Sequence, residues 1–104
     1  MSALPPLTKA LSLDSTNTTA LFCRAIAFFE TGKTDESQRD YEALLKVNPH
    51  AFPAYHGLAE IALRKKDTNN AVRFYQLDLT NAPPNSPEWR LAAERLKSLT
   101  ARAP

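Results

Sequence analysis

The chain resembles itself when residues 18–51 are written above residues 52–85, and this internal repeat is the feature that most limits how it can fold. Small, aromatic and proline positions coincide at this 34-residue shift. The coinciding pairs are Ala20 with Ala54, Ala25 with Ala59, Arg39 with Arg73, Tyr41 with Tyr75, Leu45 with Leu79 and Pro49 with Pro83. A fixed period of about 20 to 50 residues is typical of stacked repeat proteins, in which each unit buries its apolar face against its neighbours.

The same shift extends the repeat beyond two complete units. A further step of the same length places Ala93 beneath Ala59, which predicts another first helix near the C-terminus. In the opposite direction, residues 7–17 align with the tail of a preceding unit. We therefore expect one domain over residues 1–104, with a partial unit at 7–17, complete units at 18–51 and 52–85, and a capping helix at 86–100. A chain that begins inside a repeat is either a fragment of a longer array or has a degenerate N-terminal cap, and we favour the fragment.

The units read as pairs of α-helices. Apolar residues recur at intervals of three and four, and no stretch shows the alternation of a half-buried strand. Ser86 before Pro87 predicts a helix start, because the serine oxygen can accept from a free amide and proline tolerates the first turn. Pro53 fits a first turn in the same way, and Asp35 with Gln38 resembles a capping pair. The fold class predicted from these signals is all-α.

Periodicity also predicts the core and the turns. Gly32-Lys33 and Lys66-Asp67 separate the two helices of each unit, and Pro49 and Pro83 end the second helices. Trp89 and Leu96 are expected to seal the C-terminal end. The expected core residues of the two complete units are Ala20, Leu21, Ala25, Phe28, Tyr41, Leu44, Leu45, Tyr55, Leu58, Ala59, Ala62, Ala71, Val72 and Tyr75.

The repeat resembles the tetratricopeptide repeat (TPR) over about residues 7–99. The positions that carry the resemblance are Tyr55, Leu58-Ala59, Asp67, Ala71, Tyr75 and Pro83 in one unit, and Leu21, Ala25, Phe28, Gly32, Tyr41 and Pro49 in the other. Arg24 and Ser37 depart from the family pattern. The resemblance implies an α-solenoid of antiparallel helix pairs, about five helices in a right-handed superhelical stack. It also implies a non-catalytic scaffold that binds another protein, whose identity it leaves open.

The resemblance further implies that the first helix of each pair lines a concave groove, where a peptide or helix would bind. The residues expected to face this groove are Thr19, Phe22, Ile26, Phe29, Glu30, His56, Glu60, Leu63, Arg64, Arg90, Glu94 and Lys97. Phe22, Ile26 and Phe29 would anchor the ligand or, alternatively, pack on a preceding unit. Some family members bind the C-terminal carboxylate of a partner through lysines and asparagines in this groove. Here Phe22, Ile26 and Gly57 stand at three of those positions, so this mode of binding is excluded.

Enzymatic, metal and membrane functions lack the residues they require. Cys23 lies on a nearly apolar helix and is expected to be a buried, inert thiol. His50 and His56 are six residues apart, which is not the four-residue spacing of a metal pair on one helix face. The longest apolar stretch falls short of the roughly 20 residues of a membrane span. We expect no catalytic residue, no metal and no cofactor.

Two other functions remain as alternatives to docking. Self-assembly would stack the N-terminal end, around Leu7, Leu11 and Phe28, on another copy and give a weak homo-oligomer. Nucleic-acid binding is disfavoured as the main role, because 13 basic against 11 acidic residues give a net charge of only +2. The sequence leaves the compartment open, with the cytoplasm favoured.

Overall fold

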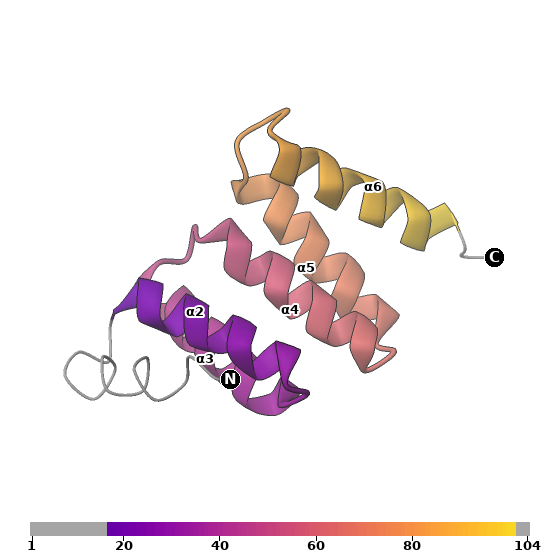
Figure 1. Cartoon of the computed structure of the whole chain (residues 1–104). Helices are drawn as coiled ribbons and strands as arrows, with labels where there is room; N and C mark the ends of the chain where they lie inside the picture. The colour runs from indigo at the N-terminus through magenta and orange to yellow at the C-terminus, as the bar shows by residue number, and fades with distance from the viewer. Residues whose placement is uncertain (1–16, 102–104) are drawn as a thin grey trace.

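The computed structural model describes residues 17–101, which fold into five α-helices joined by short connections (Figure 1). The helices are α2 (Thr18–Glu30), α3 (Thr34–Val47), α4 (Phe52–Arg64), α5 (Thr68–Asn81) and α6 (Pro87–Ala101). They account for 81% of the described residues, and this range contains no strand, so the predicted all-α class is confirmed. The partial unit expected at residues 7–17 lies almost entirely outside the described residues.

Helices that follow one another along the chain pack against one another. The α2–α3 and α4–α5 pairs share the largest contacts, and α6 packs on α5. A short turn joins the helices of each pair, so the two run antiparallel (Figure 1). The smaller α3–α4 contact joins one pair to the next. The two units of the sequence are therefore two helix pairs in the structure.

The helix starts follow the sequence signals at two of three places. Trp89 donates its backbone N–H to Ser86 Oγ at 3.1 Å, which confirms the predicted cap of α6. Pro53 lies in the first turn of α4, as predicted. The expected capping pair of α3 is wrong, because Asp35 lies inside the helix and accepts from Lys65 Nζ at 2.8 Å instead.

The turns inside the two pairs have the same backbone conformation with different residues. Gly32 has φ +83°, and Lys66, at the equivalent position of the second unit, has φ +59°. This left-handed conformation ends many helices and costs a residue with a Cβ about 1 kcal/mol or more relative to glycine. The turn after α4 is thus built on a less suitable residue than the turn after α2.

The buried core confirms ten of the fourteen residues expected in the two units. They are Ala20, Leu21, Ala25, Tyr41, Leu44, Leu58, Ala59, Ala62, Ala71 and Tyr75. Phe28, Leu45, Tyr55 and Val72 are only half-buried. The buried residues that periodicity did not identify include Ala54, Ile61, Ala82 and Ala92, and the polar residues Ser37, Asp40 and Asp78.

The last helix is displaced by one residue from the register of the repeat. Residues 48–51 connect α3 to α4, whereas residues 82–86, one residue more, connect α5 to α6. As a result Ala92 is fully buried, while Ala93, which the repeat placed beneath Ala59, is half-buried. Leu96 packs against Ala59, Tyr75 and Ala92, and Trp89 is half-buried.

An ion pair explains why Arg24 departs from the repeat pattern. Arg24 Nε and Nη2 donate to the two carboxylate oxygens of Asp40, each at 2.7 Å, and the Asp40 side chain is only 6% exposed. The equivalent positions of the second unit hold Leu58 and Phe74, which pack in the same apolar cluster. A charged pair between α2 and α3 therefore replaces an apolar pair between α4 and α5.

Ser37, the other departure, is also satisfied within the first helix pair. It is fully buried, and its hydroxyl donates to the Ala25 carbonyl oxygen at 2.7 Å. The equivalent residue of the second unit is Ala71, which is fully buried without a polar group. Both departures are local exchanges of polar for apolar groups that keep the same helix packing.

Candidate functional site

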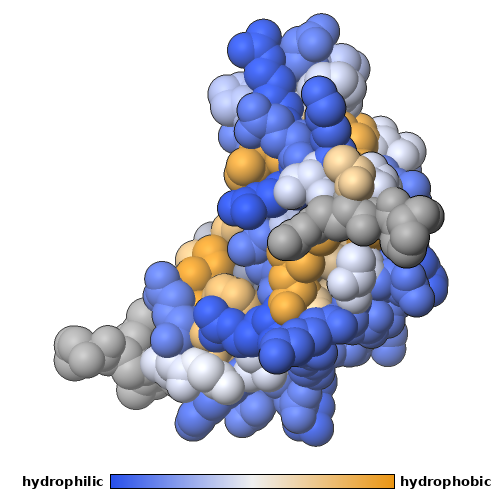
Figure 2. All heavy atoms as spheres, turned by 90° about the vertical axis from the view of Figure 1, so that its right-hand side faces the viewer, coloured by the Kyte–Doolittle hydropathy of each residue, from blue (hydrophilic) through white to orange (hydrophobic). Residues whose placement is uncertain are grey.

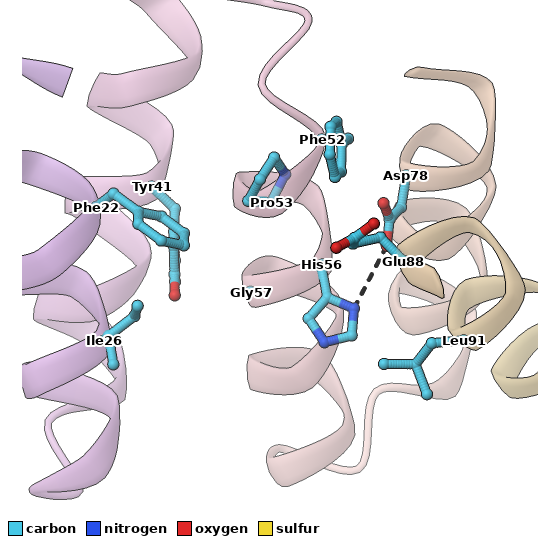
Figure 3. Close-up of a pocket in the computed structure, with 10 residues that line it drawn as sticks. All are labelled: Phe22, Ile26, Tyr41, Phe52, Pro53, His56, Gly57, Asp78, Glu88 and Leu91. Carbon is cyan, nitrogen blue, oxygen red and sulfur yellow. Dashed lines mark ion pairs between the residues drawn. The ribbon is translucent and has the colours of Figure 1, made fainter. Parts of the chain in front are cut away.

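A cleft of about 220 Å³ opens between α2, α4 and α6 (Figure 3). Its floor is α4, with side chains of α2 and α3 on one side and of α5 and α6 on the other. The lining residues are Phe22, Ile26, Tyr41, Phe52, Pro53, His56, Gly57, Asp78, Glu88 and Leu91. Most of these are apolar, and the polar groups are gathered on the α5–α6 side.

Aromatic packing shapes the α2 side of the cleft. The Phe22 ring meets the Tyr41 ring edge-to-face, with centroids 6.1 Å apart and planes at 61°. Tyr41 is buried, and burial together with the negative charges of Glu30 and Glu60 raises its pKa to about 12. The Tyr41 hydroxyl therefore stays neutral at physiological pH.

Gly57 lets Tyr41 reach the wall of the cleft. A Cβ atom built on Gly57 would overlap the ring of Tyr41, so any side chain at position 57 would displace the ring. The φ of Gly57 is not positive, so the backbone conformation does not require glycine here. Glycine is required because the Tyr41 ring approaches this position closely. The glycine is a packing residue of the cleft wall.

His56 and Asp78 form the polar end of the cleft. His56 Nδ1 lies 3.3 Å from Asp78 Oδ2, and the His56 ring also packs edge-to-face on Tyr75. The Asp78 side chain is 1% exposed and that of His56 is 33% exposed. The hydrogen bond with Asp78, assisted by the charge of Glu60, raises the pKa of His56 above its ordinary 6.5 against the opposing effect of burial.

The second carboxylate oxygen of Asp78 has no hydrogen-bond donor. Among the described residues, Asp78 Oδ1 is the one buried side-chain polar atom that is left unpartnered. A buried polar group without a partner costs about 1 to 3 kcal/mol, and a charged one more. Leu44 stands at the equivalent position of the first unit, so the packing of a helix pair does not require an acid here.

A second carboxylate, that of Glu88, also lines the cleft. Glu88 lines it from the first turn of α6, and Figure 3 draws its carboxylate beside that of Asp78 and above the His56 ring. Glu60 accepts a hydrogen bond from the Tyr75 hydroxyl, and burial and this bond raise the pKa of Tyr75 well above its usual range. The positive charge of Arg95 partly opposes the rise in the pKa of His56 and of Tyr75.

Four of the residues expected in the groove lie at or beside this cleft. Phe22, Ile26 and His56 line it directly. Thr19 lies in an adjoining hollow that shares Phe22 and Pro53 with the cleft. These four come from α2 and α4 and lie toward one face of the two helices, as their spacing predicts.

The expected groove residues at the far ends of α2 and α4 serve other contacts. The Arg64 guanidinium lies 3.9 Å from the Phe29 ring centroid and donates to the Phe29 carbonyl oxygen at 3.0 Å. Leu63 packs on the cluster of Ala59, Tyr75 and Ala92. Neither these residues nor Glu30 and Glu60 line the cleft itself.

The one-residue displacement of α6 changes which of its side chains reach the cleft. Arg90, Glu94 and Lys97 are exposed and do not line it, whereas Leu91 does. One repeat period on from His56 leads to Arg90, and one residue further leads to Leu91. The longer connection before α6 is visible in the sequence as Ala82-Pro83-Pro84-Asn85-Ser86, and this signal could have corrected the register.

The one cysteine of the chain, Cys23, does not line the cleft. Cys23, expected to be buried, is exposed, because it lies on α2 opposite the face that buries Leu21 and Ala25. Within residues 17–101, no three histidine, cysteine or acidic side chains gather as a metal-ion site would require. Helices long and apolar enough to cross a membrane are likewise missing from that range.

The described surface carries few exposed apolar residues. Val47 and Leu91, at 46% and 39% exposure, are the large hydrophobic residues most exposed in residues 17–101. On the face seen in Figure 2, hydrophobic residues form separate patches among hydrophilic ones. The predicted end-to-end stacking involves Leu7, Leu11 and Phe28, of which Leu7 and Leu11 lie outside the described residues. The third residue, Phe28, has the Arg24 guanidinium 5.6 Å from its ring centroid. Self-assembly stays a prediction.

Comparison with known proteins adds no family: neither the protein-family models nor the curated proteins contain a match to this chain.

Proposed function

We propose that this chain is a non-catalytic, TPR-like docking module, in which helix pairs stack as an α-solenoid and the α2–α4–α6 face binds a peptide or helix of another protein. The two antiparallel pairs and the equal spacing of their helix starts along the chain support the repeat. The observation that carries the function is the cleft between α2, α4 and α6, with Leu91 39% exposed at its edge.

The cleft suits one apolar anchor and predicts modest affinity. Burying a leucine- or phenylalanine-sized side chain contributes about 1.5 to 3 kcal/mol, while micromolar binding needs about 8 kcal/mol. The remainder has to come from contacts along α2, α4 and α6 outside the cleft, less the cost of ordering the peptide. An amphipathic helix laid across the three helices supplies such contacts. We expect dissociation constants in the micromolar range or weaker.

Selection from a displayed library of random 12-residue peptides tests this function while the partner is unidentified. Peptides selected on the wild-type protein should bind about tenfold more weakly to Leu91→Gln, which removes an apolar contact at the edge of the cleft. Val47→Gln is the matched control, because Val47 is exposed and lies outside the cleft.

The two variants separate docking in the cleft from adventitious binding. Equal binding to wild type, Leu91→Gln and Val47→Gln would place the peptides elsewhere and refute the proposed site. Failure to select any peptide from a large library would refute the docking function for this chain. Circular dichroism of each variant establishes that the helices are intact before affinities are compared.

A further inference from the structure

The cleft combines an apolar wall with an excess of negative charge. Asp78 and Glu88 line it, on the side formed by α5 and α6. Apart from His56, the described lining therefore carries two carboxylates and no lysine or arginine, although the whole chain carries a net charge of +2.

We propose that the cleft selects peptides in which a lysine or arginine accompanies the apolar anchor, with the anchor between Phe22 and Leu91 and the cation beside Glu88 and Asp78. This inference rests on the proposed docking function and specifies the chemistry of the partner. His56 lies between the apolar part of the cleft and its two carboxylates (Figure 3). The anchor and the cation would therefore lie within one helical turn of each other in the bound peptide.

The unpartnered oxygen of Asp78 supports a cationic ligand. Asp78 is a buried acid that lines the cleft, and its Oδ1 atom finds no donor among the described residues. His56, which contacts the other oxygen of Asp78, is 33% exposed, so this ion pair lies at the surface of the cleft. A bound ammonium or guanidinium group would add positive charge where a carboxylate is incompletely compensated, an interaction that strengthens in a site with little water.

The aromatic side chains favour the same ligand. Phe22, Tyr41 and Phe52 line the cleft, and the faces of such rings attract cations by about 0.5 to 2 kcal/mol. The Arg64 guanidinium already covers Phe29 in this way at the far end of α2, so the chain uses the contact in its own packing. An acidic peptide would instead meet Glu88 and Asp78 as like charges.

The experiment compares peptides and variants in a double-mutant cycle. Peptides selected on the wild-type protein whose binding depends on Leu91 are sequenced, and basic residues should be enriched within four positions of an apolar one. One selected peptide is then made with its lysine or arginine replaced by glutamine. Both forms are titrated into the wild type, Glu88→Gln and Glu94→Gln by fluorescence polarisation at low salt.

The expected result is a charge coupling confined to the cleft. Glu88→Gln should weaken the basic peptide about three- to fivefold and leave the glutamine peptide unchanged, the size of effect that a partly exposed ion pair gives. Glu94→Gln makes the same charge change on the same helix, outside the cleft, and should alter neither affinity by more than about twofold.

The outcomes distinguish this inference from the function on which it rests. Peptides that depend on Leu91 but show no basic enrichment, or that bind Glu88→Gln as well as wild type, would overturn the cationic preference and leave the docking function intact. Enrichment of acidic residues would do the same. Peptides that ignore Leu91, or the absence of any selected peptide, would overturn both.

Discussion

Replacing Gly57 by alanine tests whether the cleft wall is built as described. The new Cβ atom would overlap the Tyr41 ring, which is buried and meets Phe22 edge-to-face, so the ring has to move. Overpacking of this kind costs about 1 to 3 kcal/mol. The higher helix propensity of alanine offsets up to about 1 kcal/mol of that cost. We expect Gly57→Ala to lower the free energy of unfolding by about 1 to 2 kcal/mol.

The background of Tyr41→Leu should reverse the sign of this effect. Leucine ends short of the ring atoms that meet position 57, so the clash disappears while the propensity gain remains. In that background Gly57→Ala should stabilise the protein by about 0.5 to 1 kcal/mol. The two values correspond to a coupling energy of about 1.5 to 3 kcal/mol between the two positions, within the range for residues in contact.

Urea denaturation of the four proteins, followed by circular dichroism in the far ultraviolet, measures this cycle. Equal effects of Gly57→Ala in both backgrounds would refute the proposed contact with Tyr41. A stabilising effect in the wild-type background would show that the ring yields at no cost. Peptide binding in the cleft should weaken in Gly57→Ala alone, because the displaced ring enters the space beside Phe22.

Three further predictions use one repeat unit as a template for the other. Arg24→Leu alone should destabilise the protein by about 3 to 5 kcal/mol in urea denaturation by stranding buried Asp40, whereas the double variant Arg24→Leu/Asp40→Phe should be at least as stable as wild type. Lys66→Gly should raise the urea midpoint by relieving φ +59°, a gain of up to about 1 kcal/mol; an unchanged or lower midpoint would contradict the strain. The pKa of His56 in the folded protein is raised above 6.5, so its stabilising contribution is complete below pH 6.5 and is lost as the pH rises through the pKa of the folded state. The urea midpoint should therefore fall as the pH rises through this pKa, and it should fall less in His56→Phe/Asp78→Leu.

The helices and most of the core could be predicted because they follow from local pattern. Ala25 and Ala59 are small where two helices approach, and the prolines end helices through backbone geometry alone. Such signals require only a residue and its neighbours in sequence. The position of α6 could not be obtained by extending the same shift, because Asn85 adopts φ +65° in a connection that is one residue longer.

The cleft was harder to predict because its polar groups act in pairs. The repeat spacing predicts His56 as a groove residue but does not indicate its partner Asp78, since an acid on the buried face of α5 contradicts apolar periodicity. Comparison of the two units shows the exchange: Phe22 and Leu44 of the first unit stand at the positions of His56 and Asp78 in the second. Paired departures from the repeat thus mark both this contact and the one between Arg24 and Asp40.

The charged pair between α2 and α3 also affects how the chain finds its correct partners while folding. Similar helices in a repeat protein can dock on the wrong neighbour, and here α2 could meet α5 in place of α3. Arg24 would then face Phe74, and Asp40 would be left opposite Leu58, so two desolvated charges would lack partners. Each unmatched charge costs several kcal/mol, more than an apolar mismatch of similar size. Arg24 and Asp40 thus bias the first hairpin toward its own sequence register.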